Sequence, residues 1–311
     1  MKIKSLKFSN FSLLTLLVVA MFFYGCNSGG AKNKQKAEEP ELELDMSELD
    51  QGLFQDIGEV KKIFYSMPSP LETAMMIQSA GANYDESLLN SLDNVNNYST
   101  SKSMALNLGI FTCDMSFASL YDQTEGSINY MNAAKKMADG LGIMDAISDE
   151  TIQKLEENIN NRDVIMEIIS DTFMNSSSYL QENERSSVAT IVLVGGWIEG
   201  LYIATELVDT DSLESSSLAK RIVDQKLSLE IVEKLLSETK DSPDIPEILA
   251  DVQNLRASFD KITMTTTPIQ TSLDPNTNVT TLKSKTKTNL SPALFNDIKE
   301  KVKVIRNKYI S

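Results

Sequence analysis

The most constraining feature of this chain is a long apolar segment at residues 188–204. It reads VATIVLVGGWIEGLYIA, which is hydrophobic on nearly every side of a helix. Such a helix has to be covered on all sides, so other helices must pack against it. The uncharged run 186–198 is too short to span a bilayer. We therefore predict that this segment is the central helix of a globular bundle.

Glycines inside this segment indicate a close contact. Gly195, Gly196 and Gly200 each weaken a helix by about 1 kcal/mol relative to Ala. A compensating interaction must exist, and the absence of a side chain suits the near approach of a neighbouring helix or of a ligand.

Apolar periodicity and capping signals predict further helices around the central one. Ser69 and Glu72 frame the start of one of them as a capping box, with Pro70 in its first turn. With the central helix at 186–209, the predicted helices are residues 69–79, 102–122, 124–140, 149–160, 162–182, 214–240, 245–262 and 292–308. An apolar stripe before Pro68 predicts one more, at Leu53, Ile57, Val60 and Phe64.

One segment departs from the helical pattern. Residues 264–288 are rich in Thr and Ser, and a turn signal at 274–278 separates two runs of β-forming residues. Either a small β-hairpin or a surface loop fits this composition. The predicted fold is all-α: a multi-helix bundle, residues 51–311, with this hairpin or loop before the C-terminal helix at 292–308.

A short internal similarity raises the question of duplication. Residues 134–139 (AKKMAD) match 219–224 (AKRIVD) at a shift of 85 residues, and the same shift carries Asp114 onto Glu199. Two pseudo-repeated bundles, at about 102–182 and 187–263, would explain the match. Chance similarity between amphipathic helices explains it equally simply.

The N-terminus reads as an export signal. Residues 1–25 hold Lys2, Lys4 and Lys7 before a short apolar run that ends at Gly25. The Cys26 that follows resembles the lipidated cysteine of a bacterial lipobox, of the loose type seen in Bacteroidota. We predict a signal peptide at 1–25, a lipid on Cys26 that anchors the protein to a membrane, and a flexible tether at 26–50. An uncleaved anchor helix is the alternative. With Cys26 lipidated, Cys113 has no partner for a disulfide.

Composition excludes several classes of function. The chain has no histidine, which removes Ser-His-Asp and Cys-His catalysis and the common zinc sites. Removal of residues 1–25 leaves 26 basic residues against 44 acidic ones, a net charge of −18. Nucleic acid is not expected as a partner, because phosphate binding needs a basic face. We predict no enzymatic activity, no metal and no cofactor; a hydrolase that uses two carboxylates stays open.

Two acids in apolar helices mark the candidate site. Asp114 and Glu199 both sit among hydrophobic residues, where a carboxylate is costly unless it is paired or protonated. One hypothesis places them in a shared cleft that binds a ligand or partner, such as a cation or an amine, lined also by Trp197 and Tyr202. The other hypothesis is structural: each acid meets a Lys, Arg, Tyr or helix N-terminus and holds the helices in register.

Basic residues concentrate at the C-terminus. Residues 283–308 carry eight Lys or Arg residues against Asp297 and Glu300. The basic C-terminal helix either docks on the acidic body of the protein or forms a face for anionic lipid or cell-wall polymer.

Several motifs between residues 69 and 307 resemble a known group of proteins. They are SPLET at 69–73, DNVNNY at 93–98, LNLGI at 106–110, GGWIEGLY at 195–202 and IRN at 305–307. They resemble helical lipoproteins of unknown function from Bacteroidota. The resemblance implies a helical fold and a cell-envelope location; no acidic cluster follows Cys26, which favours the periplasmic face of the outer membrane.

Sequence alone thus predicts a lipid-anchored, non-enzymatic binding or scaffolding module whose partner is an unknown envelope protein. The alternative is a small-molecule or cation receptor with a pocket between helical bundles.

Overall fold

The computed structural model describes residues 68–311 apart from 148, 159–160, 267–269, 275–278 and 284–285. The predicted signal peptide at 1–25, the tether at 26–50 with Cys26, and the apolar stripe from Leu53 to Phe64 lie outside the described residues. The described residues belong to one compact unit, which falls within Asp50–Ser311.

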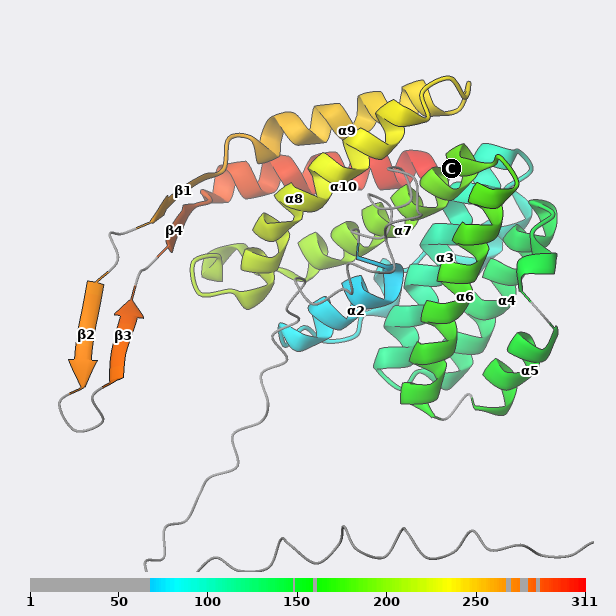
Figure 1. Ribbon diagram of the computed structural model, residues 1–311, viewed down its shortest axis with the longest axis horizontal. Coiled ribbons are helices and arrows are strands. Elements are labelled where there is room, and N and C mark those ends of the chain that lie inside the picture. Colours follow the sequence, from blue (N-terminus) through cyan, green and yellow to red (C-terminus); the bar gives the residue numbers. More distant parts are fainter. Residues whose placement is uncertain (1–67, 148, 159–160, 267–269, 275–278, 284–285) are drawn as a thin grey trace, which may run out of the picture. The chain divides into compact units, whose positions relative to one another are not determined.

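Helix α7, Ser186–Leu207, is the centre of the fold (Figure 1). It packs against α2, α3, α6, α8 and α10. Of the helices described, it alone is long and apolar enough to cross a membrane, yet 94% of its most apolar window is buried inside the protein. The helix is therefore the core of an all-α, multi-helix bundle, as the sequence predicted.

Apart from α2, which packs on α3 and α7, the other helices form two groups that both contact α7 (Figure 1). One group comprises α3, α4, α5 and α6, and the other comprises α8, α9 and α10. The helices are α2 (Pro70–Ser79), α3 (Ser101–Leu120), α4 (Thr124–Gly140), α5 (Asp149–Glu157), α6 (Arg162–Glu182), α8 (Ser217–Glu238), α9 (Ile245–Phe259) and α10 (Pro292–Tyr309), with short 3-10 turns η1 (Glu86–Leu88), η2 (Leu92–Asn96), η3 (Met144–Ala146) and η4 (Thr210–Ser212).

Local capping explains where several helices begin. The predicted capping box of α2 is present: the Ser69 hydroxyl accepts from the Glu72 N–H, and the Glu72 carboxylate accepts from the Ser69 N–H. Helix α8 begins three residues later than predicted because Ser216, not a residue near Glu214, caps it by accepting from the Ala219 N–H. Helix α7 ends before Asp209, whose carboxylate caps the turn η4 instead.

The backbones of α3 and α7 touch at glycines, as predicted from the sequence of the central helix. A Cβ added to Gly195 would overlap the carbonyl oxygen of Leu106, and one added to Gly109 would overlap that of Val192. Gly200 faces the Thr73 side chain of α2. The neighbour that compensates for the glycines is thus a helix of the same chain.

The segment before α10 contains paired strands. Strand β1 (Thr263–Thr266) pairs antiparallel with β4 (Thr286–Asn289), and β2 (Gln270–Asp274) pairs antiparallel with β3 (Val279–Lys283). Of the two predicted alternatives, hairpin pairing rather than a loop occupies the described part of 264–288.

The proposed duplication receives mixed support from helix positions. Helices α3 and α7 begin 85 residues apart, and Asp114 and Glu199 occupy the same place in each. The matched six-residue segments do not correspond, because 134–139 closes α4 whereas 219–224 lies in the first turns of α8. Duplication stays a prediction.

The contact between α3 and α7 predicts an unusual sensitivity at Gly195. We expect Gly195→Ala to lower the free energy of unfolding by about 3 kcal/mol, because the added methyl meets backbone rather than a movable side chain. Gly126→Ala in α4 is the matched control: its Cβ would come no closer than 3.6 Å to any neighbour, and the change should stabilise by about 0.5 kcal/mol. Thermal unfolding measures both, and equal effects would contradict the packing argument.

Candidate functional site

The two acids of the predicted site lie side by side at the interface of α3 and α7. Asp114 and Glu199 are both 0% exposed, and they are close enough for the charge of Glu199 to raise the pKa of Asp114. The prediction that they share one location is therefore correct. That location is the protein interior.

The counter-charge comes from the C-terminal helix. Arg306 of α10 is 5% exposed and donates from Nε and Nη2 to the two carboxylate oxygens of Glu199, each at 2.9 Å. Its Nη2 also donates to the carbonyl oxygen of Leu88 at 3.1 Å. The Tyr202 ring lies beneath the guanidinium, with the centroid 4.6 Å from Cζ. This planar, two-point geometry is the strongest form of an ion pair in a protein.

The surroundings of Asp114 favour its neutral form. Burial raises the pKa of Asp114 well above its ordinary value, and the neighbouring Glu199 charge raises it further, although Arg306 opposes the shift. Oδ2 accepts from the backbone N–H of Asn90 at 3.1 Å. Among the described residues, Oδ1 has no hydrogen-bond partner.

The electrostatics of Arg306 complete this arrangement. Burial is the largest single influence and disfavours the charge of the guanidinium. The charge and hydrogen bonds of Glu199, together with Asp114 and Tyr202, outweigh it and raise the pKa of Arg306 above its usual value.

A network of amides ties the end of the chain to the same place. The Asn90 amide donates to the Tyr98 hydroxyl at 3.0 Å and to Oδ1 of Asn107 at 3.1 Å. In turn Tyr98 donates to the carbonyl of Ile310, and Asn107 donates to the carbonyl of Tyr309. These bonds satisfy the last carbonyls of α10, which would otherwise be buried without partners.

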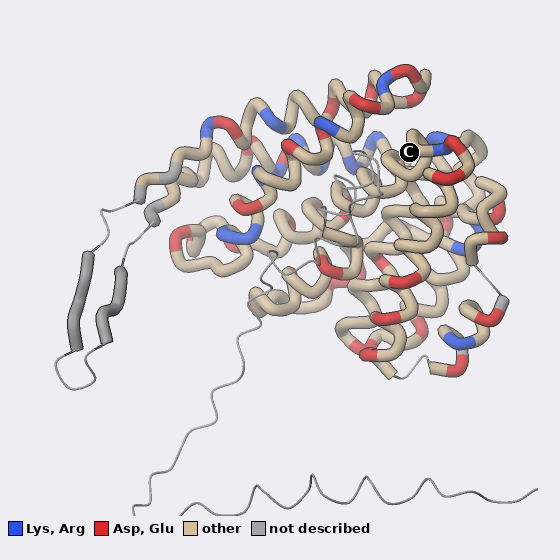
Figure 2. Tube along the Cα trace, viewed as in Figure 1, with Lys and Arg blue, Asp and Glu red and all other residues tan. Residues whose placement is uncertain are grey.

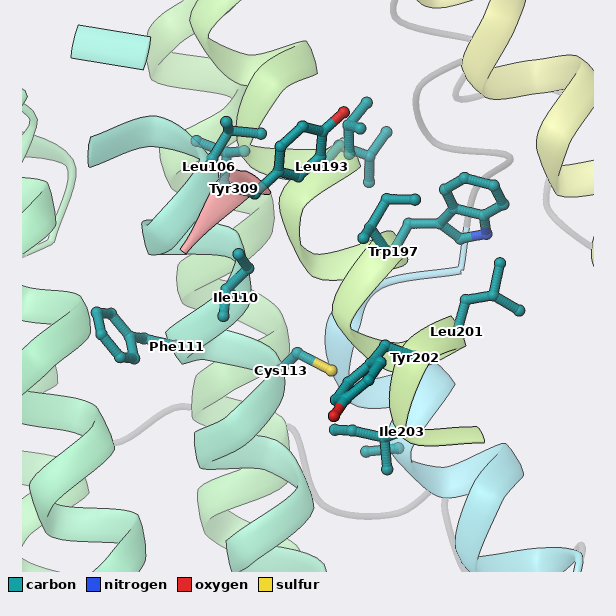
Figure 3. Close-up of a cluster of buried hydrophobic side chains, with 14 of the residues drawn as sticks. Leu106, Ile110, Phe111, Cys113, Leu193, Trp197, Leu201, Tyr202, Ile203 and Tyr309 are labelled. Carbon is teal, nitrogen blue, oxygen red and sulfur yellow. The ribbon is translucent and has the colours of Figure 1, made fainter. Parts of the chain in front are cut away.

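The predicted site therefore divides into two parts. Asp114, Glu199 and Tyr202 come together around Arg306, whereas Trp197 lies elsewhere on α7 and donates its indole N–H to Gln225 at 3.0 Å. Figure 3 shows Tyr202 on the side of α7 that faces Cys113 of α3. Trp197 projects from α7 in another direction. Cys113 is a free, buried thiol, as expected for a core residue.

No open cleft leads to the two acids. Asp114, Glu199, Trp197 and Tyr202 are at most 8% exposed, so the predicted groove lined by these four side chains is absent. The structural hypothesis accounts for the pair: its cation is a residue of the same chain. Within the part of the chain that the structure describes, no three Cys, Asp or Glu side chains gather in a way that would hold a metal ion.

Surface ion pairs continue the docking of α10. Nζ of Lys299 lies 3.0 Å from Oε2 of Glu206 in α7. Nζ of Lys308 lies 2.7 Å from Oδ2 of Asp251 and 2.9 Å from Oε1 of Glu247, both in α9. Figure 2 shows basic positions along α10. The prediction that the basic C-terminal helix docks on the acidic body is confirmed for these residues.

A cavity that sequence reasoning missed lies among α3, α4, α5, α6 and α7. Its volume is about 80 Å³. Aliphatic and aromatic side chains dominate the wall: Leu108, Met115, Met131, Ala134, Ile143, Ile147, Ile152, Leu155, Ile169, Phe173, Leu180 and Val192, with Thr112, Lys135, Thr172, Ser176 and Ser177. One feature of the sequence could have indicated this cavity: residues 175–178 are a run of small polar residues within the otherwise amphipathic segment 162–182. Small side chains there leave the core-facing side of α6 underfilled.

Comparison of this chain with protein-family models, with curated proteins and with solved structures finds no match.

The buried pair predicts strong coupling between Glu199 and Arg306. We expect Arg306→Met to lower the free energy of unfolding by about 3–5 kcal/mol, because it leaves the Glu199 carboxylate buried without a cation. The double variant Arg306→Met/Glu199→Gln should lose clearly less than the sum of its two single variants, because no unpaired charge remains. Denaturant unfolding of all four proteins measures the coupling; additive losses would show that the two groups act independently.

The raised pKa of Asp114 predicts a pH dependence of stability. Its contribution is fully present below the unfolded pKa of about 3.9 and is lost as pH rises through the folded pKa. Asp114→Asn has nearly the same shape and does not titrate. As the pH increases from about 4, the free energy of unfolding of the variant should therefore increase relative to that of the natural protein, by up to about 1.4 kcal/mol per pH unit. Thermal melts from pH 4 to 8 test this, and a difference that does not change with pH would contradict it.

Proposed function

We propose that this protein is a membrane-anchored, non-enzymatic binding protein of the cell envelope, and that it binds a small apolar ligand in the cavity between α3, α4, α5, α6 and α7. The observation that carries this proposal is the cavity itself. Protein interiors are close-packed, and an apolar pocket with a few polar groups on its wall is the usual form of a small-molecule site.

The acids of the core do not supply the recognition site in this proposal. Arg306 occupies both oxygens of Glu199, and Asp114 is fully buried and accepts from the backbone N–H of Asn90. A ligand cation would have to displace a bidentate guanidinium from a site without solvent access. This argument favours a small-molecule receptor over the predicted cleft at Asp114 and Glu199, and moves the recognition site to the other side of α3.

Access to the cavity is assigned to α5. This helix has nine residues, Asp149–Glu157, and packs against α6. It contributes Ile152 and Leu155 to the cavity wall. A short helix held by two apolar side chains opens at a lower free-energy cost than the long helices around it, so its displacement would admit a ligand without disturbing α7.

The anchoring part of the proposal rests on the N-terminal sequence. Residues 1–25 have the form of a signal peptide, and Cys26 stands at the position that lipid-modifying enzymes act on in lipoproteins. The tether of residues 26–50 would hold the binding domain near the membrane. The resemblance to Bacteroidota lipoproteins and the sequence after Cys26 favour the periplasmic face of the outer membrane.

The test fills the cavity in the full-length chain in its own envelope membranes. Ala134→Leu adds three carbon atoms at the cavity wall, and Asn132→Leu adds a Leu at an exposed position of the same helix as the matched control. Stability is followed by pulse proteolysis with immunodetection, with butan-1-ol as a neutral probe. We expect butan-1-ol to protect the natural chain and the control, and to lose this effect in Ala134→Leu.

Two outcomes would count against binding in the cavity. Equal protection of natural chain and Ala134→Leu would place the effect of the alcohol outside the cavity, and no protection of any protein would show that the space does not take a ligand. If Ala134→Leu fails to fold, Ser176→Val serves as the second filling variant, because Ser176 also lies on the cavity wall.

A further inference from the structure

We infer that the ligand of this cavity is a short-chain aliphatic monocarboxylate, with its tail among the apolar side chains and its carboxylate at Lys135. This inference rests on the proposed function and adds the chemical class of the ligand. Two observations carry it: the size of the cavity and an unpaired cation on its wall.

The size of the cavity limits the tail. A volume of about 80 Å³ holds about three atoms of the size of a water molecule, whose share of liquid volume is about 30 Å³. A cavity of about 150 Å³ is the size that takes benzene. The wall therefore suits a tail of about three carbons, such as that of butanoate, and is too small for a ring or a long acyl chain without rearrangement.

Lys135 is the charged group of the wall. It lies on α4, its side chain is exposed, and it lines the cavity, so it stands at the solvent edge. Among the residues that the structure describes, no carboxylate forms an ion pair with it, in contrast to Lys299 and Lys308. A lysine whose stem covers an apolar cavity while its ammonium group faces water is suited to the head of an amphiphilic anion.

The net charge of the protein favours a small monoanion over larger anions. The chain carries −15, so phosphorylated or polymeric anions are repelled by the molecule as a whole. A single carboxylate needs only one local cation, which Lys135 provides.

The experiment compares butanoate with its neutral counterpart in the same envelope vesicles and the same proteolysis assay. A three-carbon tail and one exposed ion pair give an expected Kd of about 1 mM, so butanoate is titrated to tens of millimolar against equal concentrations of sodium chloride. Lys135→Gln is the test variant. Lys136→Gln is the matched control, since Lys136 is adjacent, has the same charge, donates to Asn96 and does not line the cavity.

We expect Lys135→Gln to raise the Kd for butanoate by about fivefold and to leave protection by butan-1-ol unchanged, with no effect of Lys136→Gln on either. Acetate and octanoate should both protect less than butanoate at equal concentration.

The two proposals fail in different ways. If butan-1-ol protects the chain through the cavity but butanoate protects no better, or Lys135→Gln and Lys136→Gln behave alike, the carboxylate inference is wrong and a neutral ligand remains. If neither probe protects the natural chain, the binding function itself is wrong.

Discussion

The fold depends on one buried ion pair between its central helix and its last one. Glu199 in α7 would be a severe liability without a cation, and Arg306 in α10 supplies that cation with two hydrogen bonds of 2.9 Å. Burial and the charge of Glu199 raise the pKa of Asp114 beside them, which favours one negative charge rather than two next to Arg306. The pair also selects the position of α10: if the helix slid by one turn, both charges would be left buried and unpaired.

The close approach of α3 and α7 is the steric counterpart of this charge pair. Glycines at 109, 195 and 196 let the two backbones meet, and Asp114 of α3 and Glu199 of α7 both lie buried in this pair of helices. The amide network of Asn90 and Asn107 then binds the carbonyls at the end of α10. Packing, charge and hydrogen bonding therefore specify the same arrangement, in which the C-terminal helix covers the α3–α7 interface.

The rigid core and the proposed binding cavity lie on opposite sides of α3. The side toward Glu199 holds two fully buried acids and the bidentate ion pair with Arg306. The side toward α6 has small polar residues where large apolar ones would fill the space, and it is covered by the short helix α5. Such a division allows a ligand to enter without loosening the ion pair on which the fold depends.

The sequence by itself determined the helical class, the central place of residues 188–204, the capping box at Ser69 and the importance of Asp114 and Glu199. These follow from local periodicity and from the cost of burying a carboxylate, which need no knowledge of neighbours. Only the tertiary structure decided which of eight C-terminal basic residues meets Glu199, because 107 residues separate it from Arg306 and each basic side chain has similar local surroundings. The tertiary structure also decided that Trp197 lies apart from the acids. It alone revealed the cavity beside α6, because a cavity is the space that several packed helices leave unfilled and no single helix encodes it.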